Sequence, residues 1–491
     1  MLNPQDRSQP FTFLAGLLLA CLLLSSIANA APSITLSKKS GPPTSRILVS
    51  GGGFKPNVGV DIFFDTKDKA LVVTNRKGEF HDAGIHAPRS ARPGEHWVTA
   101  LERNNDKGAQ EPFLVQTNWS QFRFSPDHAG RNPFENVLNP NTVGELNLKW
   151  SYTTGRWVYS SPAVADGVVY IASEDDNMYA LNASTGAKLW SYTTGNYVFS
   201  SPAVVNGVVY VGSADQNVYA LNANTGALRW KYTTGARIEA SPAVTNGVVY
   251  IGSLDHNVYA LDASTGTLMW SYTAGGEVDA SPAVVNGVVY VGSGDHNVYA
   301  LNANTGAKLW SFATGGYVFS SPAIANGVVY VGSNDNYEYA LNAGTGALLW
   351  SYLTGNWVYE SAVANGVVYV GSFDDSVYAL DASTGARLWS YATGSWVQSS
   401  PAVANGVVYV GSADSNVYAL SARTGARLWF YTTGNFVVSS PTVANGVVYV
   451  GSVDGKVYAF SLTRSYQAEQ DTVSKRPGLK ALRPDFSLKV S

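Results

Sequence analysis

The sequence predicts an all-β protein in which an eight-bladed β-propeller follows a small β-sandwich. Three observations predict it: a unit of about 40 residues that occurs eight times, Asn-Gly or Asp-Gly turns between short alternating segments, and a composition suited to strands. Of the 491 residues 48 are Gly and 29 are Tyr, and only 14% are charged. Glycine and asparagine suit turns, while β-branched and aromatic residues suit pleated surfaces. This composition argues against a helical bundle or a coiled coil, and a net charge of −3 gives no indication of a nucleic-acid partner.

Residues 1–30 have the pattern of a secretory signal peptide. An apolar run, Phe11–Ile27, precedes the small-residue site Ala28-Asn29-Ala30. We therefore expect an exported protein, in the periplasm, at the cell surface or secreted, with no membrane span after cleavage. The only cysteine, Cys21, lies in this run, so the mature chain would have no thiol for a disulfide, a zinc site or a nucleophile. Two alternatives stay open: an uncleaved membrane anchor, and lipidation at Cys21, since Leu18–Cys21 loosely resembles a lipobox.

Residues 31–118 alternate β-like runs with Gly/Pro turns, as in Ser50–Asn57, Val60–Phe64 and Pro93–Leu101. This pattern predicts a β-sandwich of about 85 residues. At the other end of the chain, residues 464–491 are polar and contain proline. We expect them to form a poorly ordered tail.

The repeat occupies residues 150–463. In its second copy the predicted strands are Val198–Val205, Val208–Gly212, Val218–Leu221 and Leu228–Tyr232, with Asn206-Gly207 as a hairpin turn. Four strands in such a period are typical of a propeller blade. Each copy is marked by a tryptophan at a spacing of 40 residues, once 39: Trp150, Trp190, Trp230, Trp270, Trp310, Trp350, Trp389 and Trp429.

The ends of the array predict a closed ring. The last copy stops at Ser461 without an outer strand, and Leu146–Trp150 can supply it from the other end. Residues 119–149 are thus interpreted as a linker and closing outer strand, which removes an exposed sheet edge. We expect a monomer.

Proline recurs in the first strand of seven repeats. Because proline cannot donate a ladder hydrogen bond, this strand is predicted to be the innermost one, with a free edge on the channel. The sixth repeat lacks the proline. A lost bulge with a redirected Glu360 is one interpretation of this difference, and neutral drift is the other and the favoured one. The seven prolines are Pro162, Pro202, Pro242, Pro282, Pro322, Pro401 and Pro441.

The stretch Ala180–Trp190 (ALNASTGAKLW) resembles the tryptophan-docking motif of the PQQ-like β-propeller repeat family. The resemblance implies that each tryptophan stacks on the peptide at the glycine of a neighbouring blade and locks the ring. It also covers Asn139–Trp150, which is similar to the entry sequence of quinoprotein propellers. Residues 31–116 look like an immunoglobulin-like (IPT/TIG) domain, a type common on exported proteins.

The family includes PQQ-dependent quinoprotein dehydrogenases and non-catalytic members such as the outer-membrane assembly lipoprotein BamB. The dehydrogenases typically carry adjacent cysteines and long blade insertions, and this chain has neither. We find no position for their Asp base or calcium ligands, so PQQ and calcium are disfavoured and no enzyme activity is expected. A PQQ dehydrogenase and a BamB-type assembly factor remain the alternatives to a binding or scaffold protein.

Comparison of the repeats separates a variable face from a uniform face. With strands A to D from the channel outwards, the D–A and B–C connections share the variable face, and the A–B and C–D connections share the uniform face. After each T-G or A-G, two residues on one side of the strand differ between repeats. These pairs are Trp157/Tyr159, Tyr197/Phe199, Arg237/Glu239, Glu277/Asp279, Tyr317/Phe319, Trp357/Tyr359, Trp396/Gln398 and Phe436/Val438.

The pairs predict an aromatic ring around the channel mouth, interrupted by a charged sector on the third and fourth blades. Such a surface suits a protein, peptide, glycan or planar ligand, although the rings could equally serve only to fill a wide channel. His256 and His296 occupy equivalent loops beside the carboxylates and are weak metal candidates. The Asp of each B–C loop is interpreted as a turn cap. The 10 basic and 19 acidic residues of the propeller give it a charge of −9, which disfavours nucleic acid and anionic lipid.

Overall fold

The computed structural model describes residues 31–103, 105–463 and 477–482, and the predicted signal peptide with Cys21 lies outside them. Strands of the N-terminal unit form a three-stranded sheet, β1-β3-β6, and a five-stranded sheet, β2-β8-β7-β4-β5. Ile47, Ile62, Phe64 and Phe113 pack between them, which makes the unit a two-sheet β-sandwich. Its strands are β1 (Ser33–Leu36), β2 (Ser40–Gly41), β3 (Arg46–Gly52), β4 (Gly59–Phe64), β5 (Lys67–Val73), β6 (Phe80–His86), β7 (Gly94–Glu102) and β8 (Gly108–Val115).

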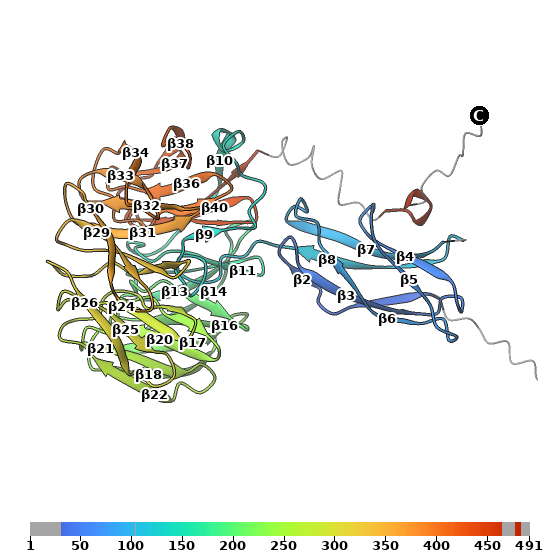
Figure 1. Cartoon of the computed structure of the whole chain (residues 1–491), viewed down its shortest axis with the longest axis horizontal. Helices are drawn as coiled ribbons and strands as arrows, with labels where there is room; N and C mark the ends of the chain where they lie inside the picture. Colours follow the sequence, from blue (N-terminus) through green and yellow to red (C-terminus); the bar gives the residue numbers. More distant parts are fainter. Residues whose placement is uncertain (1–30, 104, 464–476, 483–491) are drawn as a thin grey trace, which may run out of the picture.

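Eight further sheets of antiparallel strands make up the propeller, in the part of the chain that the structure describes (Figure 1). The innermost strands are β11 (Ala163–Ala165), β15 (Ala203–Val205), β19 (Ala243–Thr245), β23 (Ala283–Val285), β27 (Ala323–Ala325), β31 (Val358–Ala364), β35 (Ala402–Ala404) and β39 (Thr442–Ala444). The second strands are β12 (Val168–Ala172), β16 (Val208–Gly212), β20 (Val248–Gly252), β24 (Val288–Gly292), β28 (Val328–Gly332), β32 (Val367–Ser372), β36 (Val407–Gly411) and β40 (Val447–Ser452).

The third strands are β13 (Asn177–Asn182), β17 (Asn217–Asn222), β21 (Asn257–Asp262), β25 (Asn297–Asn302), β29 (Tyr337–Asn342), β33 (Ser376–Asp381), β37 (Asn416–Ser421) and β41 (Lys456–Leu462). The outer strands are β14 (Lys188–Thr193), β18 (Leu228–Thr233), β22 (Leu268–Thr273), β26 (Lys308–Ala313), β30 (Leu348–Leu353), β34 (Arg387–Ala392), β38 (Arg427–Thr432) and β10 (Leu146–Thr153). β10 follows a short 3₁₀ turn, η1 (Val143–Glu145).

The ring is closed by the strand that precedes the first repeat. β10 pairs antiparallel with β41, from Leu146 opposite Leu462 to Thr153 opposite Lys456. The innermost strands of the first and last blades, β11 and β39, also contact each other. The last blade therefore has its outer strand, and the chain ends of the array meet.

Tryptophan docking locks neighbouring blades together. The indole Nε1 of Trp270 on β22 donates to Ala303 O of the next blade at 2.9 Å. Its ring lies over Gly306, whose φ is +72°, and a Cβ at Gly306 would come within 2.7 Å of the ring, so only glycine fits there. Trp429 of the seventh blade instead donates to Leu146 O at 3.0 Å, on the closing strand. The other docking tryptophans, Trp150, Trp190, Trp230, Trp310, Trp350 and Trp389, each donate to an alanine carbonyl of the adjacent blade.

The innermost strands are shorter than the sequence predicts. In the second blade β15 begins at Ala203, whereas a strand from Val198 was expected. Pro202 cannot donate to the ladder, and the Ser200 hydroxyl accepts the hydrogen bond of Gly212 N–H instead. In the sixth blade, where the proline is missing, β31 continues from Val358 to Ala364 with one register shift next to Glu360. The strand therefore extends where the proline is missing, and one register shift lies beside Glu360.

Residues 117–132, predicted to lie at the end of one domain and in a linker, instead form a plug segment in the ring. It runs along the free edges of the innermost strands and hydrogen-bonds to at least one residue in each blade. The amides of Val204, Val284, Ile324, Val363 and Val403 donate to Ser120 O, Pro126 O, Asp127 O, Ala129 O and Gly130 O at 2.7–2.9 Å. Trp119 and Val164 form an antiparallel β-bridge. The side-chain amide of Gln121 donates to Val244 O and accepts from Val244 N–H. Asn132 Nδ2 donates to Val443 O. Residues 131–132 are also strand β9 (Arg131–Asn132), parallel to β35.

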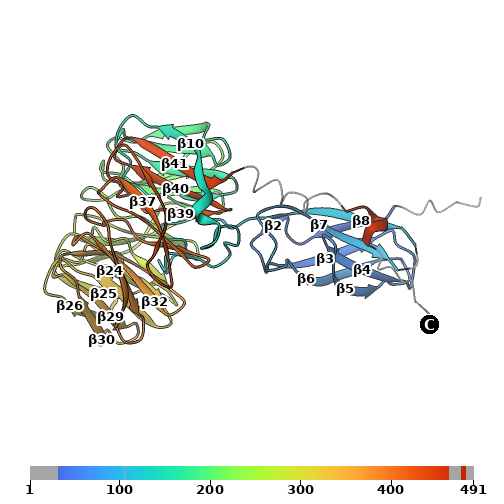
Figure 2. The same cartoon turned by 90° about the horizontal axis from the view of Figure 1, so that it is seen from above.

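The sandwich lies beside the uniform face of the propeller (Figures 1 and 2). Gln116 Nε2 donates to Asp166 Oδ1 in the A–B turn of the first blade at 2.9 Å. Asn136 Nδ2 reaches back to Ala91 O in the sandwich at 2.8 Å. The sandwich therefore leaves the variable face uncovered.

Part of the predicted tail, residues 477–482, packs against the sandwich. Pro477 O accepts a hydrogen bond from Gln110 at 2.8 Å, and the 3₁₀ turn η3 (Leu479–Leu482) buries Leu482 against Phe63 and Leu101. The expectation of a tail without structure is wrong for residues 477–482, because their leucines cover an apolar patch. No helix in the described ranges is long and apolar enough to cross a membrane.

Candidate functional site

The variable pairs converge on the mouth of the central channel. Their first members are mostly exposed, as at Trp157, Tyr317 and Trp357, which expose 45–50% of their surface. The second members line a cavity of about 300 Å³ inside the mouth: Tyr159, Phe199, Glu239, Asp279, Phe319, Tyr359, Gln398 and Val438. The residue between them is a fully buried Val or Ile, such as Val158 or Ile238. This alternation directs both members of a pair away from the core.

Aromatic rings contact one another on both sides of the mouth. Trp157 and Tyr159 lie 6.3 Å apart by ring centroids, and Tyr197 and Phe199 lie 4.8 Å apart. Across blades, Tyr159 meets Phe199 edge-to-face at 5.1 Å. These contacts make a continuous wall on the first two blades.

Phe373, in the B–C loop of the sixth blade, is a site residue that comparison of the pairs missed. It stacks on Trp396 at 5.0 Å with an interplanar angle of 9° and also contacts Trp357 and Tyr359. Trp396 in turn contacts Phe436 at 5.7 Å. Phe373 stands where the other repeats carry Glu, Ala, Leu, Gly, Asn or Val, and an aromatic residue at this position was a usable signal.

The third and fourth blades supply the charged sector. Arg237 Nε contacts Glu239 Oε1 at 2.8 Å. Burial raises the pKa of Asp279 to about 7, and the negative charges of Glu239 and Glu277 add to this shift. Burial likewise raises the pKa of Glu239. The cavity therefore has an aromatic side and an acidic side.

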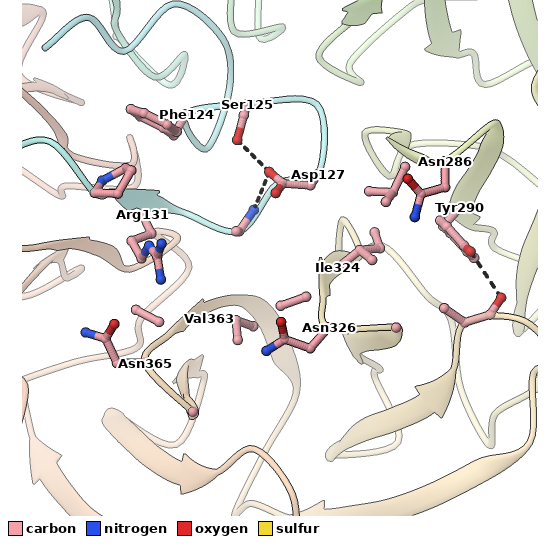
Figure 3. Close-up of a pocket in the computed structure, with 18 residues that line it drawn as sticks. Phe124, Ser125, Asp127, Arg131, Asn286, Tyr290, Ile324, Asn326, Val363 and Asn365 are labelled. Carbon is pink, nitrogen blue, oxygen red and sulfur yellow. Dashed lines mark hydrogen bonds between the residues drawn. The ribbon is translucent and has the colours of Figure 1, made fainter. Parts of the chain in front are cut away.

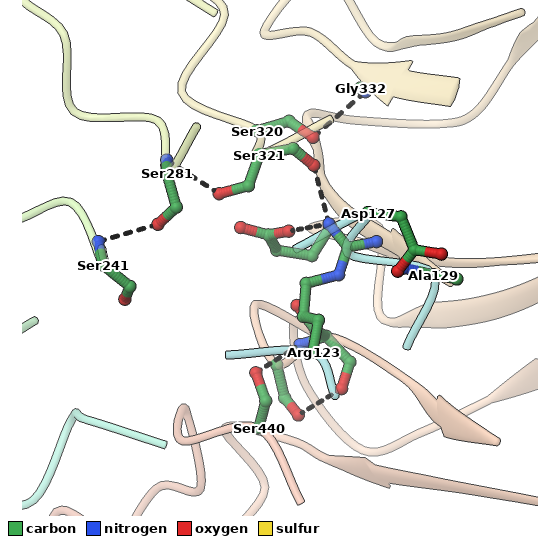
Figure 4. A network of polar contacts seen from close by, with 12 residues as sticks. Arg123, Asp127, Ala129, Ser241, Ser281, Ser320, Ser321, Gly332 and Ser440 are labelled. Carbon is green, nitrogen blue, oxygen red and sulfur yellow. Dashed lines mark hydrogen bonds and ion pairs between the residues drawn. The ribbon is translucent and has the colours of Figure 1, made fainter. Parts of the chain in front are cut away.

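A belt of serines lines the channel below these residues, and Figure 4 shows part of it, with Ser241, Ser281, Ser321 and Ser440. The backbone N–H of Ser201 donates to Ser241 Oγ, that of Ser241 to Ser281 Oγ and that of Ser281 to Ser321 Oγ, at 2.8–3.0 Å. Ser440 N–H donates to Ser161 Oγ and continues the belt across the junction of the last and first blades. Each hydroxyl thus satisfies an amide that would otherwise lie unpaired beside a proline.

Glu360 occupies the place of the belt serine in the sixth blade, as the missing proline suggested. The guanidinium of Arg123, from the plug segment, donates to Glu360 Oε2 at 3.0 Å and to Ser321 O at 2.7 Å. Both side chains are buried. Burial raises the pKa of Glu360 to about 7, while the charge of Arg123 opposes that shift.

Glu338 adds a second buried carboxylate near Arg123. It stands on β29 where the same position in other blades is Val218, Val258 or Val298, and it is fully buried. Burial raises its pKa to about 8, opposed by Arg123. This departure from the repeat is visible in the sequence and was missed, because only the variable face was compared.

Phe122 of the plug segment forms the floor of the cavity. The plug bonds to residues such as Val164, which lie further along the inner strand than Ser161 and Tyr159. The order along the channel is therefore rim residue, cavity residue, serine belt and plug. The cavity opens at the variable face and is sealed towards the uniform face.

The aspartates of the B–C loops are turn caps, as expected. Asp215 Oδ1 accepts from Asn217 N–H at 3.0 Å, and its Oδ2 accepts from Gly195 N–H and from the Tyr219 hydroxyl at 2.6 Å. These bonds lower the pKa of Asp215 despite its burial. The aspartate ties the two loops of the variable face together, so the rim residues stand on a rigid base.

His256 and His296 lie in B–C turns with φ near +72°, and the His296 ring contacts Tyr317 at 5.0 Å. Among the described residues no group of three or more His, Cys, Asp or Glu side chains could hold a metal ion. The structure does not bring the two histidines into a metal site with the carboxylates.

A second cavity, of about 430 Å³, lies on the uniform face between the plug segment and blades four to six (Figure 3). Asp127 and Arg131 of the plug face it together with Asn286, Asn326 and Asn365 of the A–B turns. The asparagines recur in nearly every repeat, with φ near +50°, and their role is to form the hairpin turn. This cavity carries little that distinguishes one blade from another.

A family model described as outer membrane protein assembly factor BamB matches residues 146–253, 197–280, 255–361 and 354–484, which is more than half of the chain. The chain belongs to this family. The predicted PQQ-like β-propeller is thereby confirmed, while the immunoglobulin-like character of the sandwich stays a prediction. No curated protein sequence matches the chain.

Solved structures with the same fold include a BamB protein, a quinohemoprotein alcohol dehydrogenase and a designed protein. BamB from Moraxella catarrhalis is 20% identical, with a TM-score of 0.57 over 64% of this chain and 99% of that one. Quinohemoprotein alcohol dehydrogenase from Comamonas testosteroni is 18% identical, with a TM-score of 0.64 over 70% and 80% of the two chains. The computationally designed Ika8 protein is 20% identical, with a TM-score of 0.59 over 64% and 99%. At these identities the likeness shows the fold alone.

The cavity of this BamB-like propeller does not suit PQQ. That cofactor is a planar polycarboxylate, and the cavity presents Glu239, Asp279 and Glu360. The guanidinium of Arg123 is already paired with Glu360 below the cavity, and that of Arg237 is paired with Glu239 at the rim. Like charges would repel the carboxylates of the cofactor.

Two carboxyl groups with raised pKa values, on Asp279 and Glu360, predict a stability that falls as the pH rises. The pKa values of Asp279 and Glu360, about 7 in the fold, lie above their unfolded values near 4. The contribution of such groups to the stability of the fold is fully present below pH ~4. It is lost as the pH rises through 7, because the carboxyl groups must then ionise inside the fold. We expect the melting temperature to fall between pH 5 and pH 8, and to fall less in Asp279→Asn. Circular dichroism measures the melting temperature at each pH. If the melting temperature of Asp279→Asn falls as much as that of the native protein, Asp279 does not titrate in this range.

Proposed function

We propose that the chain is an exported, non-enzymatic binding protein that takes a ligand or a protein partner at the mouth of its propeller. One observation carries the proposal: the residues that differ between repeats gather at the single open end of a channel whose other end the chain itself seals. Exposed tryptophans offer a large contact area at low entropic cost. The sandwich, bound at the opposite face, leaves this mouth free.

The proposal predicts that rim tryptophans contribute to binding more than to stability. Trp157→Ala, Trp357→Ala and Trp396→Ala should each weaken capture of a ligand at least tenfold, as expected for an aromatic hot spot. Trp157 and Trp357 are half exposed, so each should lower the melting temperature by only about a few degrees. The measurement is a glycan and peptide array with residues 31–491, followed by calorimetry on the hits.

Asn286→Ala on the uniform face is the matched control, because it lines the other cavity. It should leave capture unchanged. Capture that depends on Asn286 and not on the tryptophans would move the site to the wrong face. If the tryptophan variants lose stability as much as they lose binding, the aromatic rings only fill the channel and form no binding site.

A role in envelope assembly is the second candidate, favoured by the family match to outer membrane protein assembly factor BamB. In this role the rim tryptophans at the channel mouth would contact a protein partner. It predicts co-purification with an outer-membrane β-barrel protein that is lost in Trp357→Ala and retained in Asn286→Ala. Capture of a small ligand, with no co-purifying β-barrel protein, would favour the binding protein proposed above over an assembly factor.

A further inference from the structure

The lining of the cavity indicates the chemistry of its ligand, an inference that rests on the function proposed above. We propose that the cavity binds an organic cation, a protonated amine or a guanidinium group carried on a short apolar chain. Two independent features of the same cavity lead to this: its aromatic side and an unpaired carboxylate on its acidic side.

The aromatic side suits both parts of such a ligand. Tyr159, Phe199, Phe319 and Tyr359 line the cavity above the Phe122 floor. Ring faces carry partial negative charge and attract cations, more strongly in a site with little water. The same rings would cover an alkyl chain. A cavity of about 300 Å³ limits the bound group to a small molecule or one side chain.

The acidic side contains more negative charge than the protein neutralises. Glu239, Glu277, Asp279 and Glu360 face the mouth or the cavity, against the guanidinium groups of Arg237 and Arg123. Arg237 pairs with Glu239 and Arg123 pairs with Glu360. Within the described part of the chain, Asp279 has neither a hydrogen bond nor an ion pair. Its carboxylate therefore lines an aromatic cavity without a partner, and a cation would supply one.

A metal ion fits this arrangement less well than an organic cation. Hard metal ions require several converging oxygen ligands, and no such group of three occurs in the described ranges. Aromatic walls contribute nothing to the coordination of such an ion. They do stabilise a large, weakly hydrated cation.

Binding of a cation should also depend on pH. The groups around Asp279 are Glu239, Glu277, Arg237 and Glu360, and the hydroxyl of Tyr359 stays protonated because burial and these carboxylates raise its pKa. The pKa of Asp279, about 7 without ligand, means that half of the molecules must lose a proton near neutral pH before they bind. Affinity should rise from pH 5.5 to pH 8.

The test is isothermal calorimetry of residues 31–491 with 1,5-diaminopentane and, as a neutral match, 1,5-pentanediol. We expect saturable binding of the diamine and at least tenfold weaker binding of the diol. N-Acetyl-lysine methylamide is the second arm. Tighter binding of the lysine derivative would assign the cation to a peptide side chain, and tighter binding of the diamine to a free amine.

Asp279→Asn and Glu239→Gln should each weaken diamine binding about tenfold, and Asp279→Asn should reduce the rise with pH. Asp166→Asn is the control, because it removes one negative charge on the uniform face and introduces the residue that seven other repeats carry. Equal binding of diol and diamine, or equal losses in Asp166→Asn and Asp279→Asn, would overturn the inference. Capture of a neutral array ligand through the rim tryptophans, with no amine binding, would overturn it and leave the proposed function standing; no binding at all would overturn both.

Discussion

Arg123→Met is expected to destabilise the propeller by about 3–5 kcal/mol at pH 8. The substitution leaves the Glu360 carboxylate buried without its 3.0 Å partner, with the Glu338 side chain nearby. At pH 5 the loss should be smaller, because both carboxyls, with pKa values of about 7 and about 8, are then protonated. Urea unfolding at the two pH values measures the difference.

The double variant Arg123→Met/Glu360→Gln is the control. Removing both charges of a buried pair costs far less than removing one, so most of the stability should return at pH 8. The amides of Val363 and Val403, which bond to the plug, should exchange hydrogen faster in the single variant only. A pH-independent loss, or no recovery in the double variant, would mean that Arg123 acts through packing and not through its charge.

Trp270→Ala is expected to cost about 3–5 kcal/mol, the range for removing a large buried aromatic side chain. Trp270 is only 8% exposed, donates to Ala303 O and covers Gly306 of the next blade. Its loss opens a cavity at a junction between blades and leaves that carbonyl without its indole donor. Chemical unfolding followed by tryptophan fluorescence would measure this.

Trp357→Ala is the matched comparison, since it removes the same side chain from the rim. Trp357 is 45% exposed, so its loss should cost roughly 1 kcal/mol or less. Similar costs for the two variants would contradict the division of the tryptophans into docking and rim groups.

Much of the fold could be predicted because the same pattern of turns, strands and tryptophans occurs eight times in the sequence. The closing strand was predicted from the absence of an outer strand after Ser461, and β10 begins at the expected Leu146. The docking role of the tryptophans was implied by the resemblance of Ala180–Trp190 to the docking motif of the PQQ-like repeat family. The position of the pairs at the channel mouth followed from the antiparallel order of the blade strands, which puts the D–A and B–C connections on one face, and from alternation within the strand.

The plug segment could not be predicted in this way. Its partners are backbone groups of eight strands about 40 residues apart, and such bonds impose no period on residues 117–132. Its one specific signal is charge: Arg123 needs Glu360, and Glu338 stands where other blades carry valine. Each departure looks neutral alone, and only the fold brings them together.

The position of a bound ligand tests the central claim most directly. A crystal structure of residues 31–491 with the strongest array ligand should show it inside the mouth, against Phe319 and Tyr359 and above Phe122. A ligand seated between the plug and blades four to six, beside Asn286 and Asn326, would contradict the account, because binding would then use the face on which the repeats are alike.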